Sequence, residues 1–223
     1  MIAKQHAAEH AVQSVTDGMT VGLGTGSTSA FAIKAIGRKI QQGLNVKAVA
    51  SSIQSEKLAK DAGITVVPFS EINIINIYID GADEVDNHLN LIKGGGGALL
   101  REKILAFNSE QFVVIVDEFK LVKQLGKFPL PVEVTSFAVE LTIRQLQKLG
   151  CAPTVRQQEG KSYITDNKNF IIDCDFQKID QVEKLHELLN AIPGVVENGL
   201  FLNNMVSKVI VGYQSGEIKV IER

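Results

Sequence analysis

Two carboxylates three residues apart follow an apolar run near the middle of the chain. The run Ile74–Ile79 is typical of a strand buried on both faces of a parallel sheet, and Asp80 and Asp83 come directly after it. Ligands of open α/β sheets bind at the carboxyl ends of strands, and an aspartate is costly to bury without a partner. The pair therefore indicates chemistry on a polar substrate. A capped, solvated turn that happens to contain three aspartates is the alternative.

A second segment with chemical character, Gly22-Leu23-Gly24-Thr25-Gly26-Ser27-Thr28, joins a predicted strand to a predicted helix. Glycines let the backbone approach a ligand, and helix N-terminal amides with nearby hydroxyls suit a phosphate. A dinucleotide is the rival ligand, but the GxGxxG pattern needs glycine where Ser27 stands, and Ala50-Ser51-Ser52 supplies no acidic residue after the second strand. The sequence favours a phosphate or sugar hydroxyls. A glycine turn capped by Ser27 or Thr28 is the simpler explanation.

Four consecutive glycines, Gly94–Gly97, come directly after Lys93. Such a run costs conformational entropy on folding, so it makes sense where backbone amides must line a ligand. Lys93 adds a fixed positive charge at the start of the loop. A flexible loop with a surface lysine is the alternative, and the position between a predicted strand and a predicted helix makes that alternative the weaker one.

Three further charged residues are candidates for a site. Glu102 lies about one turn into the helix predicted from Ala98, among apolar residues three and four positions away, and a carboxylate in apolar surroundings is a stronger base. Arg101 and Lys103 have apolar neighbours at the same spacings, so this feature alone favours the simpler explanation, a glutamate stabilised by the helix dipole. Lys4, on the first helix, and Lys120, just past a predicted strand, are solvated lysines by default. The aspartates at 80, 83 and 86 match neither an EF-hand nor an Asp-x-Asp pair, so a metal is only a minor alternative.

The composition narrows the classes of function. The chain has 223 residues, 45% of them hydrophobic, and a net charge of −2, which excludes a strongly basic surface for nucleic acid. Cys151 and Cys174 have no metal-site spacing and read as small buried residues in a reducing compartment. No stretch of 18 uninterrupted apolar residues is present, so we expect a soluble, cytoplasmic protein without a membrane partner.

The element pattern changes in kind along the chain. Up to residue 117, predicted strands and helices alternate, which favours a Rossmann-like, largely parallel sheet with helices on both faces. After the Pro-rich bend at Phe128–Pro131 the order becomes β-α-β-β-α-β, as in a ferredoxin-like α+β unit. Two last strands form a hairpin that can return to the first sheet. We therefore expect an α/β catalytic domain over 1–129 and 204–223, and a smaller domain over 130–203.

The predicted elements are as follows. Strands are expected at 19–24, 46–51, 64–68, 74–80, 88–93, 112–117, 132–134, 153–157, 170–176, 195–201, 206–211 and 217–221; helices are expected at 2–16, 27–41, 55–62, 98–108, 137–149 and 180–191. Five strand ends carry unusual polar or glycine-rich segments, at 24–28, 51–52, 80–86, 93–97 and 117–120. We expect them to form one crevice that suits a small phosphorylated polyol.

Five segments together resemble the ribose-5-phosphate isomerase family of type A, in family order across nearly the whole chain: Gly22–Thr28, Tyr78–Asp86, Ile92–Lys103, Gly126–Val134 and Ala191–Phe201. The resemblance implies an aldose–ketose isomerase that interconverts D-ribose 5-phosphate and D-ribulose 5-phosphate, with an α/β main domain, a ferredoxin-like lid, a homodimer, and no cofactor or metal. One departure is Gly97, where many members have alanine; we expect a slightly looser loop.

The resemblance also implies residue roles. Glu102 would move the proton between C1 and C2 through an ene-diolate, and Asp80 and Asp83 would serve ring opening and hydroxyl proton transfer. Lys93 and the glycine amides would stabilise the ene-diolate oxygen. The residues implied to contact substrate are Lys4, Thr25, Gly26, Ser27, Thr28, Asp80, Gly81, Ala82, Asp83, Lys93, Gly94, Gly95, Gly96, Glu102 and Lys120.

Two rival classes remain open on the sequence. One is a sugar-phosphate deaminase or a CoA-transferase-like enzyme on a related scaffold, which ammonia release or acyl-CoA turnover would reveal. The other is a sugar-phosphate-binding regulator without catalysis. The complete set Asp80, Asp83, Lys93 and Glu102 argues against the regulator.

Overall fold

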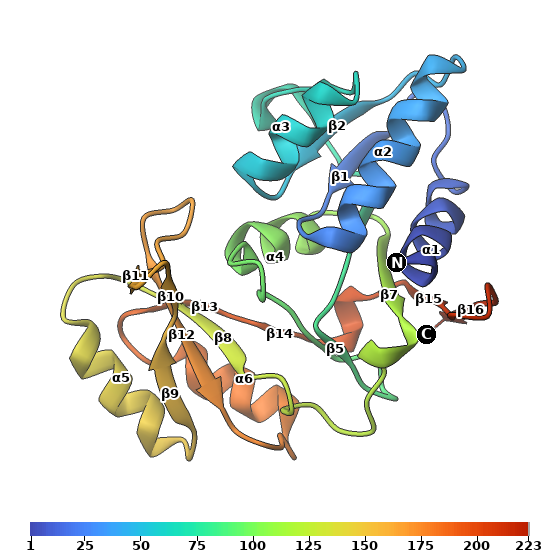
Figure 1. Ribbon diagram of the computed structural model, residues 1–223. Coiled ribbons are helices and arrows are strands. Elements are labelled where there is room, and N and C mark those ends of the chain that lie inside the picture. Colours follow the sequence, from blue (N-terminus) through green and yellow to red (C-terminus); the bar gives the residue numbers. More distant parts are fainter. Residues whose placement is uncertain (223) are drawn as a thin grey trace. The chain divides into compact units, whose positions relative to one another are not determined.

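The computed structural model describes residues 1–222, and the chain divides into two compact units (Figure 1). The first unit comprises Met1–Ala82, Arg101–Leu121 and the residues from Asn204 onward. The second comprises Asp83–Leu100 and Val122–Asn203. The domain bounds expected from the sequence, with a catalytic domain and a lid, stay a prediction. No helix within residues 1–222 is long and apolar enough to cross a membrane.

The first unit is built on a seven-stranded sheet in the order β16-β15-β7-β4-β1-β2-β3. Neighbouring strands pair in parallel except for the antiparallel hairpin β15–β16, which joins the sheet through β7. The strands are β1 (Thr20–Leu23), β2 (Lys47–Ala50), β3 (Thr65–Val66), β4 (Ile77–Asp80), β7 (Phe112–Asp117), β15 (Lys208–Gly212) and β16 (Ile218–Glu222). The predicted largely parallel α/β sheet, and the return of the last hairpin to it, are confirmed.

Helices flank this sheet, and small side chains set how closely they pack. The helices are α1 (Ile2–Val12), α2 (Ser27–Gln41), α3 (Ile53–Asp61) and α4 (Leu99–Phe107). In α1 the fully buried side chains include Ala3, Ala7 and Ala11, a helical stripe with no bulk. Helix α1 therefore lies close against α2, β7 and β15 (Figure 1). Gly212 has no room for a side chain beside the Ala3 carbonyl.

The direction of winding reverses between β1 and β4. From β1 the chain moves outward through β2 and β3, and it then returns to place β4 on the other side of β1. Ligands of open α/β sheets bind at such a switch point, beyond the carboxyl ends of the two strands. Here the segments in that position are the turn that begins at Gly24 and the turn that begins at Asp80. The fold alone therefore marks this pair of turns as the candidate site.

The second unit contains a four-stranded antiparallel sheet in the order β13-β8-β12-β9, with helices α5 (Val139–Lys148) and α6 (Val182–Asn190). Its strands are β8 (Leu130–Val134), β9 (Ala152–Val155), β12 (Phe170–Asp175) and β13 (Val195–Asn198). This is the predicted β-α-β-β-α-β order. A small sheet β14-β6-β5 is formed by β5 (Glu84–Val85), β6 (Leu91–Ile92) and β14 (Leu200–Phe201), and a hairpin by β10 (Gln157–Gln158) and β11 (Lys161–Ser162).

Several element boundaries differ from the prediction for physical reasons. Helix α3 begins two residues early because the Ser52 hydroxyl caps it by accepting the Ser55 amide. The strand predicted over 195–201 is split at Gly199, so that β13 pairs with β8 while β14 pairs with β6. The predicted strand 88–93 is reduced to β6, which lies outside the seven-stranded sheet. Strand β5 and the hairpin β10–β11 are not predicted from the sequence at all.

Candidate functional site

Asp80 lies at the switch point and is completely buried at the end of β4. Its Oδ1 accepts hydrogen bonds from the Thr25 amide at 3.0 Å, the Ser29 hydroxyl at 2.8 Å and the Gly81 amide at 2.8 Å. Its Oδ2 accepts the hydroxyl proton of Tyr78. A buried carboxylate needs such donors, and these four tie the turn after β1 to the turn after β4.

The turn after β1 rests on a cluster of hydroxyl groups. Thr25 Oγ1 lies 2.8 Å from the Ser51 Oγ, 2.9 Å from the Ser52 Oγ and 3.2 Å from the Ser55 Oγ. The Ser55 hydroxyl also donates to the Gly24 carbonyl at 2.7 Å. The polar residues at 51–52 are thus buried and support the turn from below. Gly24 is required, because a Cβ at this position would overlap the Asp80 carboxylate.

Helix α2 begins directly after this turn and presents its N-terminus. Its N-cap is Gly26, whose positive φ of +102° is a conformation that favours glycine, so no side chain of the N-cap residue covers the first amides. Gly26 and Ser27 are exposed, and Thr25 and Thr28 are half-buried. The Lys4 ammonium donates to the Ser27 hydroxyl at 3.1 Å and lies 3.8 Å from Asp117 Oδ2. An uncapped helix N-terminus beside a lysine is suited to bind an anion.

Further residues at this edge come from β7 and the helices. Lys120 ends the short 3-10 helix Glu118–Lys120 that follows β7, and it is half-buried. A Cβ built on Gly81 would lie 3.8 Å from the Thr28 Cβ and 4.0 Å from the Ser29 Oγ, and Ala82 follows Gly81 in the chain. Four of the five predicted polar strand ends, those after β1, β2, β4 and β7, therefore lie at one edge of one sheet. The prediction that 93–97 follows a strand of that sheet is wrong, since it follows β6.

Glu102 lies in the first turn of α4 and is only 3% exposed. Burial and the negative charges of Asp80 and Glu102 raise the pKa of the Tyr78 hydroxyl well above its usual value. The charge of Glu102 therefore acts on a residue at the switch point. The ring of Tyr78 is itself fixed by stacking on Phe112, with the ring centroids 5.0 Å apart. Two carboxylates thus act on one buried hydroxyl group.

The second unit holds the remaining predicted residues in the loop Lys93–Gly97. Lys93 is 2% exposed, and its ammonium lies 5.4 Å from the centre of the Phe201 ring. The half-exposed Asp83 accepts the Gly95 amide at 2.7 Å through Oδ2. Gly94 and Gly97 have positive φ values of +100° and +80°, which glycine adopts without strain. The run of glycines is therefore a defined turn, closed by the Gly97 amide on the Gly94 carbonyl at 2.9 Å.

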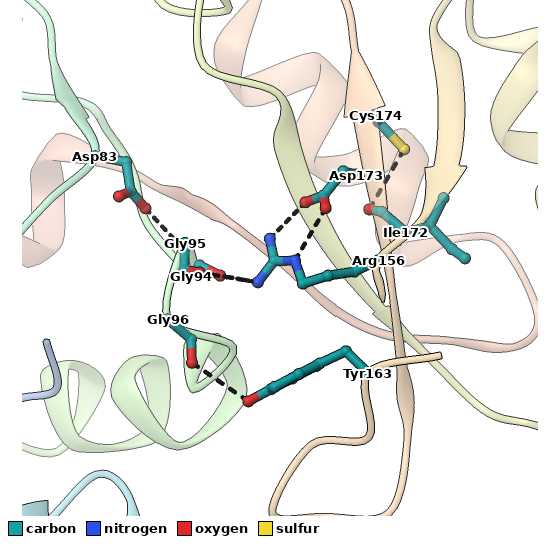
Figure 2. Close-up of polar contacts among 9 residues, drawn as sticks. All are labelled: Asp83, Gly94, Gly95, Gly96, Arg156, Tyr163, Ile172, Asp173 and Cys174. Carbon is teal, nitrogen blue, oxygen red and sulfur yellow. Dashed lines mark hydrogen bonds and ion pairs between the residues drawn. The ribbon is translucent and has the colours of Figure 1, made fainter. Parts of the chain in front are cut away.

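Sequence reasoning missed two residues that contact this loop, Arg156 and Tyr163, and a third, Asp173, that binds Arg156; all are shown in Figure 2. Arg156 donates through Nη1 to the carbonyls of Gly94 at 2.8 Å and Gly95 at 3.1 Å. The same guanidinium binds Asp173 through Nε at 2.9 Å and Nη2 at 2.5 Å. The Tyr163 hydroxyl donates to the Gly96 carbonyl at 3.4 Å.

Arg156 and Tyr163 flank the hairpin β10–β11. Its turn residues Glu159 and Gly160 both have positive φ, as a two-residue hairpin turn requires, and Gly160 is the one sequence signal for it.

Asp86, the third aspartate of the segment, has backbone amides as partners. Its Oδ1 accepts hydrogen bonds from the backbone amides of His88 and Asn90, each at 2.8 Å. For Asp86 the structure therefore has the turn that was the alternative explanation of this segment. Across residues 1–222 no three His, Cys, Asp or Glu side chains come close enough together to hold a metal ion.

The chain is similar to known proteins along nearly its whole length. The chain matches the family described as Ribose 5-phosphate isomerase A (phosphoriboisomerase A) over residues 47–216. Ribose-5-phosphate isomerase A of Bacillus mycoides (strain KBAB4) is 50% identical over 217 residues, which cover 97% of this chain and 98% of that protein. The chain belongs to the ribose 5-phosphate isomerase A family. It is therefore an enzyme of the isomerase class.

Solved structures of the ribose 5-phosphate isomerase A family share the fold. The structure from Methanocaldococcus jannaschii has a TM-score of 0.93 and 44% identity, and the match covers 99% of this chain and 98% of that one. A D-ribose-5-phosphate isomerase in complex with phospho-erythronic acid has a TM-score of 0.95 and 42% identity, with 99% and 97% covered. The resemblance and the fold class inferred from the sequence are thereby confirmed.

Proposed function

We propose that this enzyme interconverts D-ribose 5-phosphate and D-ribulose 5-phosphate through an ene-diolate, with Glu102 as the general base. The observation that carries the proposal is the pair of buried carboxylates, Asp80 and Glu102, whose charges both act on the Tyr78 hydroxyl at the switch point. The Oδ1 of Asp80 accepts three hydrogen bonds from the two turns, so this carboxylate is committed to holding them together. The other, Glu102, is the better candidate for a base.

In the proposed reaction the Glu102 carboxylate removes the proton from C2 of the open-chain aldose and returns it to C1. The electron pair of the C–H bond forms the C1–C2 double bond, and the carbonyl oxygen O1 becomes an oxyanion. When the proton returns to C1, the O2 hydroxyl loses its proton and O1 gains one, so that C2 becomes the carbonyl; Asp83 is the group proposed to carry this proton. A positioned base and fixed donors at the oxyanion both lower this barrier. Lys93 and the amides of the glycine loop are the proposed donors. The reaction uses no metal or cofactor.

The two aspartates have different parts in the proposal. Asp83 is half-exposed and uses Oδ2 for the Gly95 amide, so it is the group proposed to exchange a proton with the sugar hydroxyls during ring opening. Asp80 is fully buried beneath Gly24 and Thr25. We propose that its carboxylate acts through the turns it joins, by holding Thr25 and Ser29 in place for the substrate.

The phosphate is proposed to bind at the N-terminus of α2. The exposed amides after Gly26, the hydroxyls of Ser27 and Thr28, and the ammonium of Lys4 support this, since an anion is stabilised there by the helix dipole and by charge-assisted hydrogen bonds. Lys120, at the end of β7, is the second proposed cation. Gly81 and Ala82, between the two aspartates, complete the proposed contact set.

Solvent deuterium exchange tests the function and the base together. The purified wild-type protein should convert ribose 5-phosphate to ribulose 5-phosphate in D2O and carry deuterium into the product. Glu102→Gln should keep KM within a few fold and lose about 10²–10⁴ in kcat and in exchange. The matched control is Glu71→Gln, on the exposed short helix Phe69–Glu71, which should behave as wild type. Near wild-type exchange by Glu102→Gln would remove Glu102 from the role of base.

We also propose a homodimer that works in the cytoplasm in pentose phosphate metabolism. The family resemblance supports the dimer, and two-fold dimers are the commonest oligomers. Two buried cysteine thiols that form no disulfide within residues 1–222 suit a reducing compartment. Light scattering of the purified protein should give twice the mass of one chain, and a monomer mass at working concentration would contradict the dimer.

A further inference from the structure

We propose that Arg156 is a positioning residue for catalysis: it aims the Gly96 amide at the developing oxyanion by holding the carbonyls of Gly94 and Gly95. This inference rests on the proposed function. The contacts that carry it lie within the second unit and are drawn in Figure 2.

The guanidinium of Arg156 has two sets of bonds on opposite sides. Nε and Nη2 bind the two carboxylate oxygens of Asp173 on β12, which fixes the plane of the group. Nη1 is then left to donate to Gly94 and Gly95, at 2.8 and 3.1 Å. The arginine side chain is only 14% exposed. Its backbone is fixed as well, because its amide donates to Ile171 and its carbonyl accepts from Tyr163.

A hydrogen bond to the carbonyl of a peptide group also fixes the direction of the amide in that group. In a trans peptide the C=O and the next N–H point in opposite directions. With the Gly94 carbonyl on Arg156, the Gly95 amide points away from it, and it is found on Asp83 at 2.7 Å. With the Gly95 carbonyl on Arg156, the Gly96 amide must point away from the guanidinium too.

Among the amides of Gly95, Gly96 and Gly97, the Gly96 amide is the one left for a ligand. The Gly95 amide is used by Asp83 and the Gly97 amide by the Gly94 carbonyl, whereas no group within residues 1–222 accepts from Gly96. Gly96 is also exposed. Because glycine has more backbone freedom than any other residue, this amide would otherwise sample many directions. Arg156 restricts it, and the positive charge behind the carbonyls strengthens the amide as a donor.

Steady-state kinetics of Arg156→Met, with Arg144→Met as the matched control, tests this role. Arg144 is an exposed residue of α5 and loses the same charge from the same unit. Loss of a whole oxyanion donor costs about 10²–10³ in kcat, so a donor that is present but no longer aimed should cost about tenfold or more. We expect this loss in Arg156→Met with KM within threefold, and wild-type kinetics in Arg144→Met. Arg156→Lys should recover part of kcat.

Two measurements separate positioning from stability. The double variant Arg156→Met/Asp173→Asn removes the carboxylate that the single variant leaves unpaired, so its melting temperature should return toward wild type while kcat stays low. Phospho-erythronic acid carries a carboxylate where the ene-diolate has its oxygens, and its inhibition constant should rise by the same factor by which kcat falls.

Recovery of kcat together with stability, or an unchanged inhibition constant, would overturn the positioning role and leave the isomerase intact. A wild-type protein that does not interconvert the two sugars would overturn the proposed function, and this inference with it.

Discussion

The turn after β1 and the glycine loop after β6 are both glycine-rich connections that lead into a helix, but they are held in place by different chemistry. The turn Gly24–Ser29 is supported from below by neutral serine hydroxyls and by Asp80, all from the strand ends of one sheet. The loop Gly94–Gly97 is held from the side by Asp83 and by Arg156, a charged residue about sixty positions away in the sequence.

The two kinds of support suit the two groups that the turn and the loop are proposed to bind, the phosphate and the oxyanion. Strand ends in one sheet are fixed by the sheet itself, so a turn built on them is rigid and suits a group of constant shape such as a phosphate. Four consecutive glycines have no such support, and their order depends on charged side chains from another segment. We therefore expect variants of the turn to alter substrate binding and stability, and variants of the loop to alter kcat.

The largest expected effect is the loss of the phosphate itself. Unphosphorylated ribose should have a kcat/KM lower by about 10²–10⁶, because two to three charge-assisted hydrogen bonds contribute about 1.5–3 kcal/mol each. The measurement is turnover of both sugars by the wild type and by a loop variant, Lys93→Met. If the two regions have separate tasks, the ratio between the sugars is the same in both proteins. Comparable turnover of ribose and its phosphate would contradict the role of the α2 N-terminus.

Removal of the buried ammonium of the loop ranks next. Lys93→Met keeps the stem that lies near Phe201 and should lower kcat by about 10²–10³, the usual cost of one oxyanion donor, with KM within about threefold. The control is Lys127→Met, an exposed lysine of the same unit. A rise in KM at constant kcat would instead assign Lys93 to substrate binding and remove the contrast between the regions.

Alanine at two of the loop glycines should give unequal effects. A Cβ on Gly95 would lie 2.6 Å from Asp83 Oδ1, so Asp83 must move, and we expect kcat to fall about tenfold, equivalent to 1.4 kcal/mol. A Cβ on Gly97 would overlap the Tyr163 hydroxyl oxygen and would lie 2.5 Å from its Cε1 and 2.6 Å from its Cζ, all at the outer end of a half-buried side chain that can swing aside. Gly97→Ala should therefore keep kcat within about threefold and lower stability by about 1–2 kcal/mol, since φ is +80° there. Equal effects would mean that Asp83 does not depend on the loop.

The smallest expected effect is on stability at alkaline pH. It concerns Tyr78, which donates to Asp80 beside the turn after β1, and not the glycine loop. The pKa of Tyr78 is raised by burial and by two carboxylates, so the folded protein keeps its proton while the unfolded chain loses it above about pH 10. The free energy of unfolding should therefore fall by about 1.4 kcal/mol per pH unit above pH 10 from this group.

Denaturant titrations from pH 9 to 11 measure this slope. Tyr78→Phe should be less stable at pH 8, because Asp80 loses a donor, but its slope should be smaller by that amount. Arg156→Met should keep the wild-type slope, because a guanidinium does not titrate in this range. Parallel curves for wild type and Tyr78→Phe would contradict the raised pKa.

The two regions also differ in how far the sequence predicts them. The strand and helix around the turn have strong patterns: helix 27–41 and strand 112–117 have the predicted bounds, and the switch point follows from the βα order. The contacts of Arg156 and Tyr163 with the glycine loop could not be predicted from such patterns. The hairpin of β10 and β11 is made of Gln157, Gln158, Lys161 and Ser162, all polar, so no apolar periodicity marks it. Without the hairpin, nothing in the sequence connects Arg156 to Gly94.

The hairpin β15–β16 has a consequence for synthesis of the chain. Strand β15 completes the sheet by pairing with β7, although about ninety residues separate the two strands. Every residue of the second unit is translated before β15. Until β15 has paired, β7 has an apolar strand edge without a neighbour on that side, whereas the second unit contains no residue that follows Asn203. A purified chain truncated after residue 203 should accordingly be protease-resistant in the second unit and aggregate through Phe112–Asp117.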